Sequence, residues 1–170
     1  TSMIGLALGQ IFFGPLSDKY GRRPLLLVSM LLFIVSTLFC LFAPDIYSFV
    51  TLRLIQGIAG AGGIVISRSV AIDKFSGKEL AKMLAVIGAI NGVAPVAAPV
   101  IGGLLTGSVG WQGIFMILLF IGILLGIGCI RFKESLPAEK RSKTGVWATF
   151  RSFGIIVHNR RYMLYVFQLA

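Results

Sequence analysis

Charged residues are scarce in this sequence, and long stretches lack them altogether. Only 13% of the 170 residues are Asp, Glu, Lys or Arg, whereas 56% are hydrophobic. Soluble domains carry roughly a quarter charged residues, so water is excluded as the only solvent of this chain. No charge occurs in Leu25–Ala43, Met83–Val109 or Trp111–Ile130. Each stretch can cross a membrane, because about 20 helical residues span the ~30 Å hydrocarbon layer.

Cysteine and histidine are almost absent, with two cysteines and one histidine. Cys40 and Cys129 fall near opposite membrane faces if their stretches span the bilayer, which is too far apart for a disulfide. His158 stands alone, so no cluster of metal ligands can form around it. No nucleophile stands beside a suitable base. The sequence therefore predicts no enzyme, no metal site and no cofactor.

The apolar stretches predict an all-α, multi-pass transmembrane helical bundle. Besides the three uncharged stretches, Ile46–Ile72 is apolar apart from Arg53 and Arg68. Thr1–Ser17 is also uncharged and lacks a start methionine, and Tyr162–Ala170 has the composition of a further span. We therefore expect a piece of a longer polypeptide, with whole spans between two partial ones.

The positive charge is confined to alternate loops. The net charge is +10, but apart from Arg53 and Arg68 all of the 16 Lys and Arg residues lie in the segments 18–24, 73–82 and 131–161. The loops between these segments contain no Lys or Arg. This alternation follows the positive-inside rule, so we expect the three basic segments to be cytoplasmic. It indicates a membrane protein and no nucleic-acid partner.

Spans and loops divide the chain into three predicted parts. Residues 1–130 form the first transmembrane half, 131–161 a cytoplasmic central loop, and 162–170 the start of the second half. Apolar residues at helical spacing within the loop fit a helix lying on the membrane surface, and a disordered linker is the alternative. These residues are Trp147, Phe150, Phe153 and Val157.

Small residues recur at four-residue spacing along several spans. Such stripes let helix backbones approach closely in lipid. We expect packing alone at the last stripe, whereas at the others packing coincides with the movement of helices against one another. The stripes are Gly5/Gly9, Gly57/Ala61, Gly88/Gly92, Ala94/Ala98/Gly102 and Gly122/Gly126.

A constellation of glycines and charges occupies the first basic segment, Gly14-Pro15-Leu16-Ser17-Asp18-Lys19-Tyr20-Gly21-Arg22-Arg23-Pro24. Its carboxylate can cap a helix N-terminus or pair with arginines, and such contacts can form in one conformation and break in another. At every constrained position the segment resembles the loop signature of the major facilitator superfamily. The resemblance implies a cytoplasmic gate made of Gly14, Asp18, Lys19, Gly21, Arg22 and Arg23.

Arg53 lies within a predicted span, seven residues past Ile46, or roughly 10 Å inside the outer boundary by helix rise. A cation at this depth is costly unless it faces a partner or a water-filled cavity, which favours a functional role over snorkelling. The spans contain no carboxylate, so we expect its acidic partner on helices outside this chain. Arg68 either faces the inner end of the same cavity or snorkels. Asp73 is expected to end the span in solvent.

The pattern Arg53-x-x-Gln56-Gly57 resembles a fourth-helix motif of proton-coupled facilitators. The resemblance implies that Arg53 favours the ionised form of a nearby acid and so takes part in proton transfer. The predicted cavity and proton-coupling residues are Arg53, Gln56, Gly57 and Arg68.

A third constellation lies in Met83–Val109. Two prolines four residues apart each remove a backbone hydrogen bond, so we expect a bend, with a simple packing kink as the alternative. The segment resembles the fifth-helix antiporter motif, although alanine replaces three of its glycines, at Ala85, Ala94 and Ala98. The resemblance implies a pivot made of Asn91, Pro95, Pro99, Gly102 and Gly103.

Together the three constellations most resemble the Bcr/CflA group of drug-resistance transporters. The resemblance implies a carrier with two six-helix halves, of which this chain covers helices two to six and the start of seven. It implies efflux of drugs or other small amphiphilic compounds across the plasma (inner) membrane by alternating access, driven by a proton gradient. The expected partners are the lipid bilayer, a drug-like substrate, protons and the rest of the polypeptide.

Two other functions remain open at this stage. A transporter of the same fold for a metabolite such as a sugar, amino acid or peptide would keep most of these residues. A membrane sensor or scaffold would use the same spans without moving a substrate, although Arg53 and the loop signature argue against it.

Overall fold

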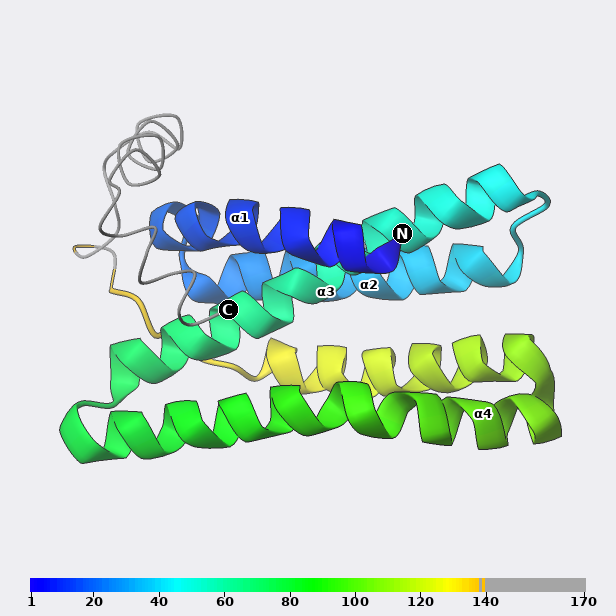
Figure 1. The fold of residues 1–170 in the computed structure, drawn as a ribbon. Helices are drawn as coiled ribbons and strands as arrows, with labels where there is room; N and C mark the ends of the chain where they lie inside the picture. The colour runs from blue at the N-terminus through cyan, green and yellow to red at the C-terminus, as the bar shows by residue number, and fades with distance from the viewer. Residues whose placement is uncertain (138, 140–170) are drawn as a thin grey trace, which may run out of the picture.

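The computed structural model describes residues 1–137 and 139, and the described part is built of α-helices without a strand (Figure 1). The all-α prediction is confirmed. The predicted surface helix within 131–161 and the predicted span at 162–170 lie outside the described residues. The helices are α1 (Ser2–Tyr20), α2 (Arg22–Leu41), α3 (Ile46–Lys74) and α4 (Gly77–Ile130).

Helix α4 is two helices joined by a reversal at Gly110. This residue has φ 68° and ψ 179°, a backbone conformation that favours glycine because it has no side chain. We call residues 77–109 the first leg and residues 111–130 the second leg of α4. The legs run in opposite directions in Figure 1. The turn lies where the sequence predicted an outer loop between two spans.

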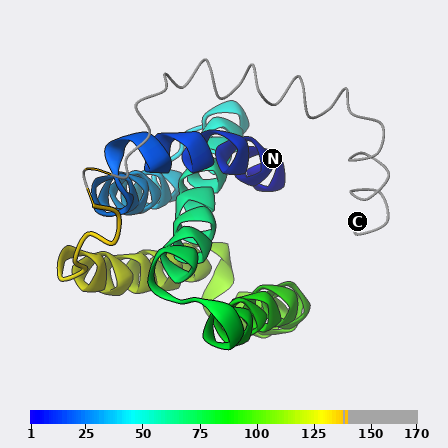
Figure 2. The same ribbon diagram turned by 90° about the vertical axis from the view of Figure 1, so that its left-hand side faces the viewer.

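Helix α3 packs extensively against both α1 and α2, whereas α4 packs mainly against α2 and only slightly against α3 (Figure 2). A small apolar core joins the first three helices around Phe13, Leu25, Ala61 and Ile66. The first leg stands apart from α1 and α2 in Figure 2. Packing therefore centres on α3, which carries the predicted cavity residues.

Glycines bring α1 and α3 into backbone contact. A Cβ atom at Gly5 would overlap the carbonyl oxygen of Leu54, and one at Gly57 would overlap that of Ser2. At Gly9 a Cβ would lie 2.6 Å from the Cβ of Ala61. Close approach along the first two predicted stripes is therefore confirmed, as expected for helices that pack without a hydrophobic driving force.

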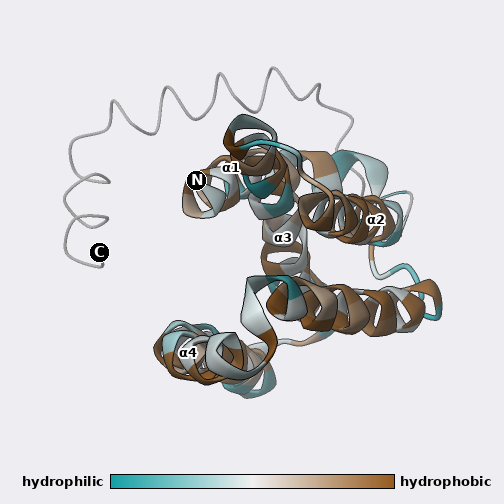
Figure 3. Cartoon of the chain, turned by 90° about the vertical axis from the view of Figure 1, so that its right-hand side faces the viewer, coloured by the Kyte–Doolittle hydropathy of each residue, from teal (hydrophilic) through white to brown (hydrophobic). Residues whose placement is uncertain are grey.

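The outside of the bundle is apolar, as Figure 3 shows over most of α2 and much of α4. Leu31 is 63%, Leu104 74% and Phe120 64% exposed. Soluble monomers rarely expose apolar patches beyond a few hundred Å². Among the described helices, α2, α3 and α4 are long and apolar enough to cross a membrane. The chain is therefore part of a multi-pass membrane protein.

The basic segments meet at one end of the bundle. The end of α1, the start of α2, the end of α3 and the start of α4 all lie on the left of Figure 1, together with the chain that follows Ile130. The link between α2 and α3 and the reversal at Gly110 lie at the opposite end. We call these the basic end and the outer end.

The glycine contacts predict how two matched substitutions differ. Gly57→Ala places a methyl group against the Ser2 backbone, so we expect the full-length protein to lose about 1–3 kcal/mol of stability through overpacking. Gly60→Ala, one turn away on α3, meets no atom within 4 Å and is expected to leave stability unchanged or raise it. Thermal unfolding of the purified proteins measures both, and equal midpoints for the two variants would contradict the packing.

Candidate functional site

Arg53 is the first link of a polar chain that crosses from α3 to α2. Its Nη1 donates a 2.8 Å hydrogen bond to Oε1 of Gln56, and Nε2 of Gln56 donates a 2.6 Å bond to Oγ1 of Thr37. The Thr37 hydroxyl donates in turn to the carbonyl of Phe33. Gln56 is 4% exposed and Thr37 fully buried. Because every bond in the chain is directional, the chain fixes both the Gln56 amide and the Arg53 guanidinium.

One aromatic ring lies over this arginine, and two others support that ring. The Arg53 Cζ lies 5.4 Å from the centre of the Phe115 ring, on the second leg of α4. Phe115 packs edge to face against Phe49 and Trp111, with ring centres 5.6 Å and 6.2 Å apart. A cation over a ring face is attracted by the ring quadrupole, and more strongly where water is excluded. Three helices, α2, α3 and α4, thus hold one guanidinium.

A cavity of about 250 Å³ lies beside the polar chain. Its lining combines Arg53 and Gln56 with mostly apolar surface. Within residues 1–137 and 139, no carboxylate lies within ion-pair distance of Arg53. The cavity therefore offers a cation and an amide to whatever enters it. The lining residues come from all four helices: Ser2, Met3, Leu6, Phe33, Arg53, Gln56, Gly57, Gly60 and Leu118.

Arg68 does not reach this cavity. It is exposed, and it lies 15 residues beyond Arg53 toward the basic end of α3. The structure therefore brings Arg53, Gln56 and Gly57 together and leaves Arg68 apart.

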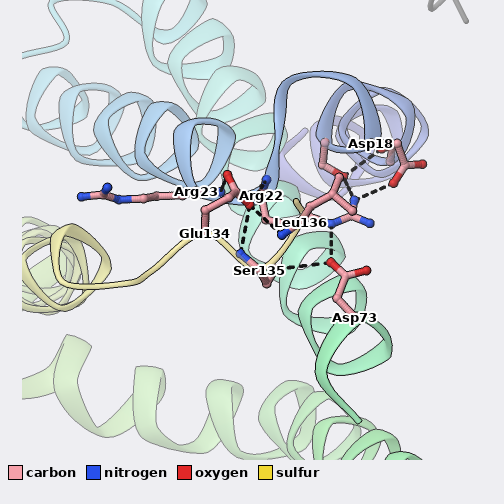
Figure 4. A network of polar contacts seen from close by, with 9 residues as sticks. Asp18, Arg22, Arg23, Asp73, Glu134, Ser135 and Leu136 are labelled. Atoms are coloured by element: carbon pink, nitrogen blue, oxygen red, sulfur yellow. Dashed lines mark hydrogen bonds and ion pairs between the residues drawn. The ribbon is translucent and has the colours of Figure 1, made fainter. Parts of the chain in front are cut away.

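A second polar cluster closes the basic end of the bundle around Arg22 (Figure 4). The Arg22 Nη1 donates to Oδ1 of Asp18 at 2.6 Å and to Oγ of Ser17 at 2.5 Å. Its Nε donates to Oδ2 of Asp73 at 3.0 Å. Arg22 is 6% exposed and Ser17 fully buried. One guanidinium therefore ties the end of α1, the start of α2 and the end of α3.

Asp73 stands at an exposed position near the end of α3, as expected, but it has a partner that the sequence did not reveal. Its side chain is 15% exposed, because it pairs with Arg22 and accepts a 3.3 Å hydrogen bond from the Ser135 hydroxyl. In sequence Asp73 looks like an ordinary helix end, and only the packing of α2 against α3 reveals its partner.

Sequence reasoning also missed Glu134, which caps the N-terminus of α2. Its Oε1 accepts the backbone N–H of Arg22 at 2.9 Å, and its Oε2 that of Arg23 at 3.2 Å. Two unpaired amides and the positive end of the helix dipole are satisfied by one carboxylate. The feature of the sequence that could have pointed to Glu134 is its position as an acidic residue directly after Arg131 and Lys133, in a segment whose charges are mostly basic.

The other predicted gate residues have separate roles. Gly21 has φ 100°, which allows the chain to leave α1 and enter α2 within one residue. Gly14 supplies the carbonyl that accepts the Ser17 hydroxyl. Lys19 lies 5.3 Å from the centre of the Tyr20 ring. Arg23 points away from the cluster in Figure 4 and bonds to the carbonyl of Ile130.

The predicted pivot residues lie on the first leg of α4 and contact neither cluster. The backbone keeps helical dihedral angles through Pro95 and Pro99, and only Gly110 departs from them within α4. A Cβ atom at Gly102 or Gly103 would meet nothing within 4 Å. Asn91 is half-buried on the same leg. In the described part of the chain this leg therefore presents an open surface.

Long apolar helices with one polar cluster beside a mostly apolar cavity and another at the basic end define a polytopic membrane protein. A sequence model of the Major Facilitator Superfamily matches residues 1–170. The chain belongs to the major facilitator superfamily.

Several named proteins are similar to the chain. An uncharacterised MFS-type transporter of Bacillus subtilis (strain 168), YdgK, is 39% identical over 96% of this chain and 41% of its own length. A bicyclomycin resistance protein homologue of Haemophilus influenzae is 33% identical over 71% of this chain and 30% of its own length. The multidrug resistance protein MdtL of Salmonella heidelberg is 30% identical over 81% of this chain and 35% of its own length. These relatives confirm the resemblance to the drug-resistance group.

A solved structure supports the fold. The crystal structure of the human organic anion transporter MFSD10 (TETRAN) matches with a TM-score of 0.66 at 26% identity, over 84% of this chain and 34% of that chain. The chain thus spans less than half the length of each of these proteins.

The Arg22 cluster predicts an order of effects among three acid-to-amide substitutions. Asp73→Asn weakens the Arg22–Asp73 ion pair, in which both side chains are largely shielded from solvent. We therefore expect the full-length protein to lose about 1–3 kcal/mol of stability. Asp18→Asn should lower stability less, because the Asp18 side chain is 54% exposed. Asp45→Asn at the exposed N-cap of α3 is the control and should change stability little, because an Asn oxygen can still accept from the Ser48 hydroxyl and Asn caps helices as well as Asp. Thermal midpoints of the purified proteins give the order, and a midpoint for Asp73→Asn equal to that for Asp45→Asn would contradict it.

Proposed function

We propose that this chain forms the cavity and the cytoplasmic gate of a proton-coupled exporter of drugs or other small amphiphilic compounds. The observation that carries the proposal is the half-buried Arg53 guanidinium, which lines a cavity in an otherwise apolar bundle. A charge at this depth is retained mainly where it acts on a substrate, an ion or a proton.

Proton coupling follows from the electrostatics of Arg53. An acid brought close to the guanidinium, from helices outside this chain, would be held in its ionised form. When the acid moves away, or when substrate separates the two, it would take up a proton. The Gln56–Thr37 chain and the Phe115 ring keep the guanidinium in place. The protonation of the acid therefore depends on where the acid itself stands. Proton uptake and substrate movement would thereby be linked.

The Arg22 cluster is proposed to close the cytoplasmic side during part of the cycle. Its bonds join three helix ends and are short and directional, so they hold one arrangement or break. Opening requires α1 or α3 to move relative to α2, and Arg22 then exchanges its carboxylates for water. On this proposal the basic segments are cytoplasmic and the membrane is the plasma membrane.

The first leg of α4 is proposed to carry the movement between states. Its prolines, Pro95 and Pro99, remove backbone hydrogen bonds and so lower the cost of bending. Its glycines, Gly102 and Gly103, present a smooth surface to the second half of the carrier. The mostly apolar lining of the Arg53 cavity suits a lipophilic substrate. The names of the relatives MdtL and the bicyclomycin resistance homologue support a drug-like substrate.

Substitution of Arg53 tests this proposal. In the full-length protein, Arg53→Ala should reduce drug resistance and pH-gradient-driven drug efflux to the level of cells without the transporter, with its amount in the membrane unchanged. Arg53→Lys should have almost as little efflux as Arg53→Ala, although it keeps the positive charge. An ammonium cannot bond to Gln56 and cover the Phe115 ring with the planar geometry of a guanidinium. Efflux from cells or vesicles with and without an imposed pH gradient measures both.

Ser67→Ala is the matched control on the same helix. The Ser67 hydroxyl is exposed and, among the described residues, bonds only to the carbonyl of Ile64 on its own helix, so efflux should remain at the wild-type level. Wild-type, gradient-dependent efflux by Arg53→Ala would refute the coupling role.

A further inference from the structure

An apolar groove runs along the outside of the bundle between α2 and the second leg of α4. It has a volume of about 330 Å³ and ends near the basic end. Among its lining residues are Leu27, Met30 and Ile34 from α2, with Ile123, Gly126 and Ile130 from α4. In the part of the chain that the structure describes, no polar side chain contributes to the lining. In a membrane such a groove suits an acyl chain or the side chains of another helix.

The groove exists because glycine replaces larger side chains on the second leg. At Gly122, which is buried, a Cβ atom would lie 3.3 Å from the Phe33 ring, so the helices touch there. At Gly126 the nearest atom to such a Cβ is Cδ1 of Ile34, at 3.2 Å. Toward Ile130, which is 60% exposed, the lining opens outward. Both glycines thus bring the second leg close to α2, and the slot lies beside this contact, with Gly126 in its lining.

The depth of the groove matches one leaflet of a bilayer. Arg23 and Ile34 are 11 residues apart on α2, which is about 16 Å along the helix. Half of the ~30 Å hydrocarbon thickness is about 15 Å. A chain that enters beside Arg23 therefore reaches the bilayer midplane when it reaches Ile34.

A cation stands at the open end of the groove. Arg23 is exposed, and its Nη2 donates a 3.0 Å hydrogen bond to the carbonyl of Ile130, which itself lines the groove. Within residues 1–137 and 139 its guanidinium makes this one hydrogen bond, so most of its five N–H donors remain available. Figure 4 shows the side chain pointing away from Asp18 and Asp73.

The other charges at this opening favour an anion. Arg131 follows Ile130 directly, and Lys133 follows two residues later, and both are exposed. The nearby carboxylate is that of Glu134, whose two oxygens accept backbone N–H groups at the start of α2. Its charge is therefore offset by the positive helix terminus.

We propose that this groove binds one anionic glycerophospholipid of the membrane leaflet at the basic end. An acyl chain fills the slot between α2 and the second leg of α4, and the headgroup phosphate accepts hydrogen bonds from the Arg23 guanidinium. Arg131 adds a second positive charge near the phosphate. An arginine fork bonds a phosphate through two N–H groups at once, which a lysine cannot do. The site is separate from the Arg53 cavity and does not depend on the transported substrate.

Two substitutions in the full-length protein test the headgroup and the acyl chain separately. Phosphatidylglycerol or phosphatidylcholine is added to the delipidated protein in detergent, and bound lipids are counted by native mass spectrometry. Arg23→Gln should weaken binding of phosphatidylglycerol about tenfold, the worth of a charge-assisted hydrogen bond, and leave phosphatidylcholine unchanged. Gly126→Leu should abolish tight binding of both lipids, because its side chain fills the slot.

Matched variants provide the controls. Gly128→Leu lies two residues along the same leg, where an added side chain meets nothing within 4 Å, and it should keep wild-type binding. Lys78→Gln removes an exposed cation of another basic segment and should keep the preference for phosphatidylglycerol. Leu31→Trp, at an exposed lining position, replaces Gly126→Leu if that variant fails to accumulate, and it should also block both lipids.

Three outcomes would overturn the proposal. Equal lipid binding by Gly126→Leu and Gly128→Leu would show that no chain lies in the slot. An unchanged preference for phosphatidylglycerol in Arg23→Gln would remove the headgroup contact. Absence of any tightly bound lipid on the wild-type protein would show that helices of the remaining polypeptide cover the groove.

Discussion

One half-buried guanidinium in an apolar bundle is the constraint on which the rest of this structure depends. Arg53 stands roughly 10 Å from the outer boundary of its span by helix rise, where an uncompensated cation is expensive. Its charge is met by the Gln56 oxygen and by the Phe115 ring, and Gln56 is in turn held by Thr37. These partners come from α2, α3 and α4, so the relative positions of three helices are fixed by one side chain. The same cation leaves the adjoining cavity open to an anion, an acid or a polar substrate group.

Helix α3 links this cavity to the basic end of the bundle. Arg53 lies near one end of α3 and Asp73 near the other, and Asp73 pairs with Arg22. The glycine contacts at Gly5 and Gly57 hold α1 against the part of α3 next to Arg53. A shift of α3 relative to α2 therefore alters both the Gln56–Thr37 bond and the Arg22–Asp73 pair. This shared helix gives a physical route by which events in the cavity and at the basic end can influence each other.

The fold could be predicted from the sequence because its signals are local. Runs without charge predict where the helices lie. The alternation of basic and non-basic loops predicts that successive helices cross the membrane in opposite directions. The spacing of small residues predicts the contact of α1 with α3. Arg53 and the Asp18–Arg22 pair were found because charged groups in or beside a span need partners, whereas Gln56 was named through the resemblance of the motif Arg53-x-x-Gln56-Gly57. The roles of Asp73 and Glu134 were missed, since their partners lie 51 and 112 residues away. Phe115 gave no signal at all, because one aromatic residue in an apolar span resembles any other.

The central claim is that position 53 faces a hydrated cavity, and cysteine accessibility tests it most directly. In full-length protein without other cysteines, Arg53→Cys in intact membranes would be treated with a membrane-impermeant, charged thiol reagent and with a lipid-soluble one. The account predicts labelling by the charged reagent, and slower labelling when a transported drug is present. Labelling by the lipid-soluble reagent alone, unaffected by any drug, would place position 53 against acyl chains and contradict the account.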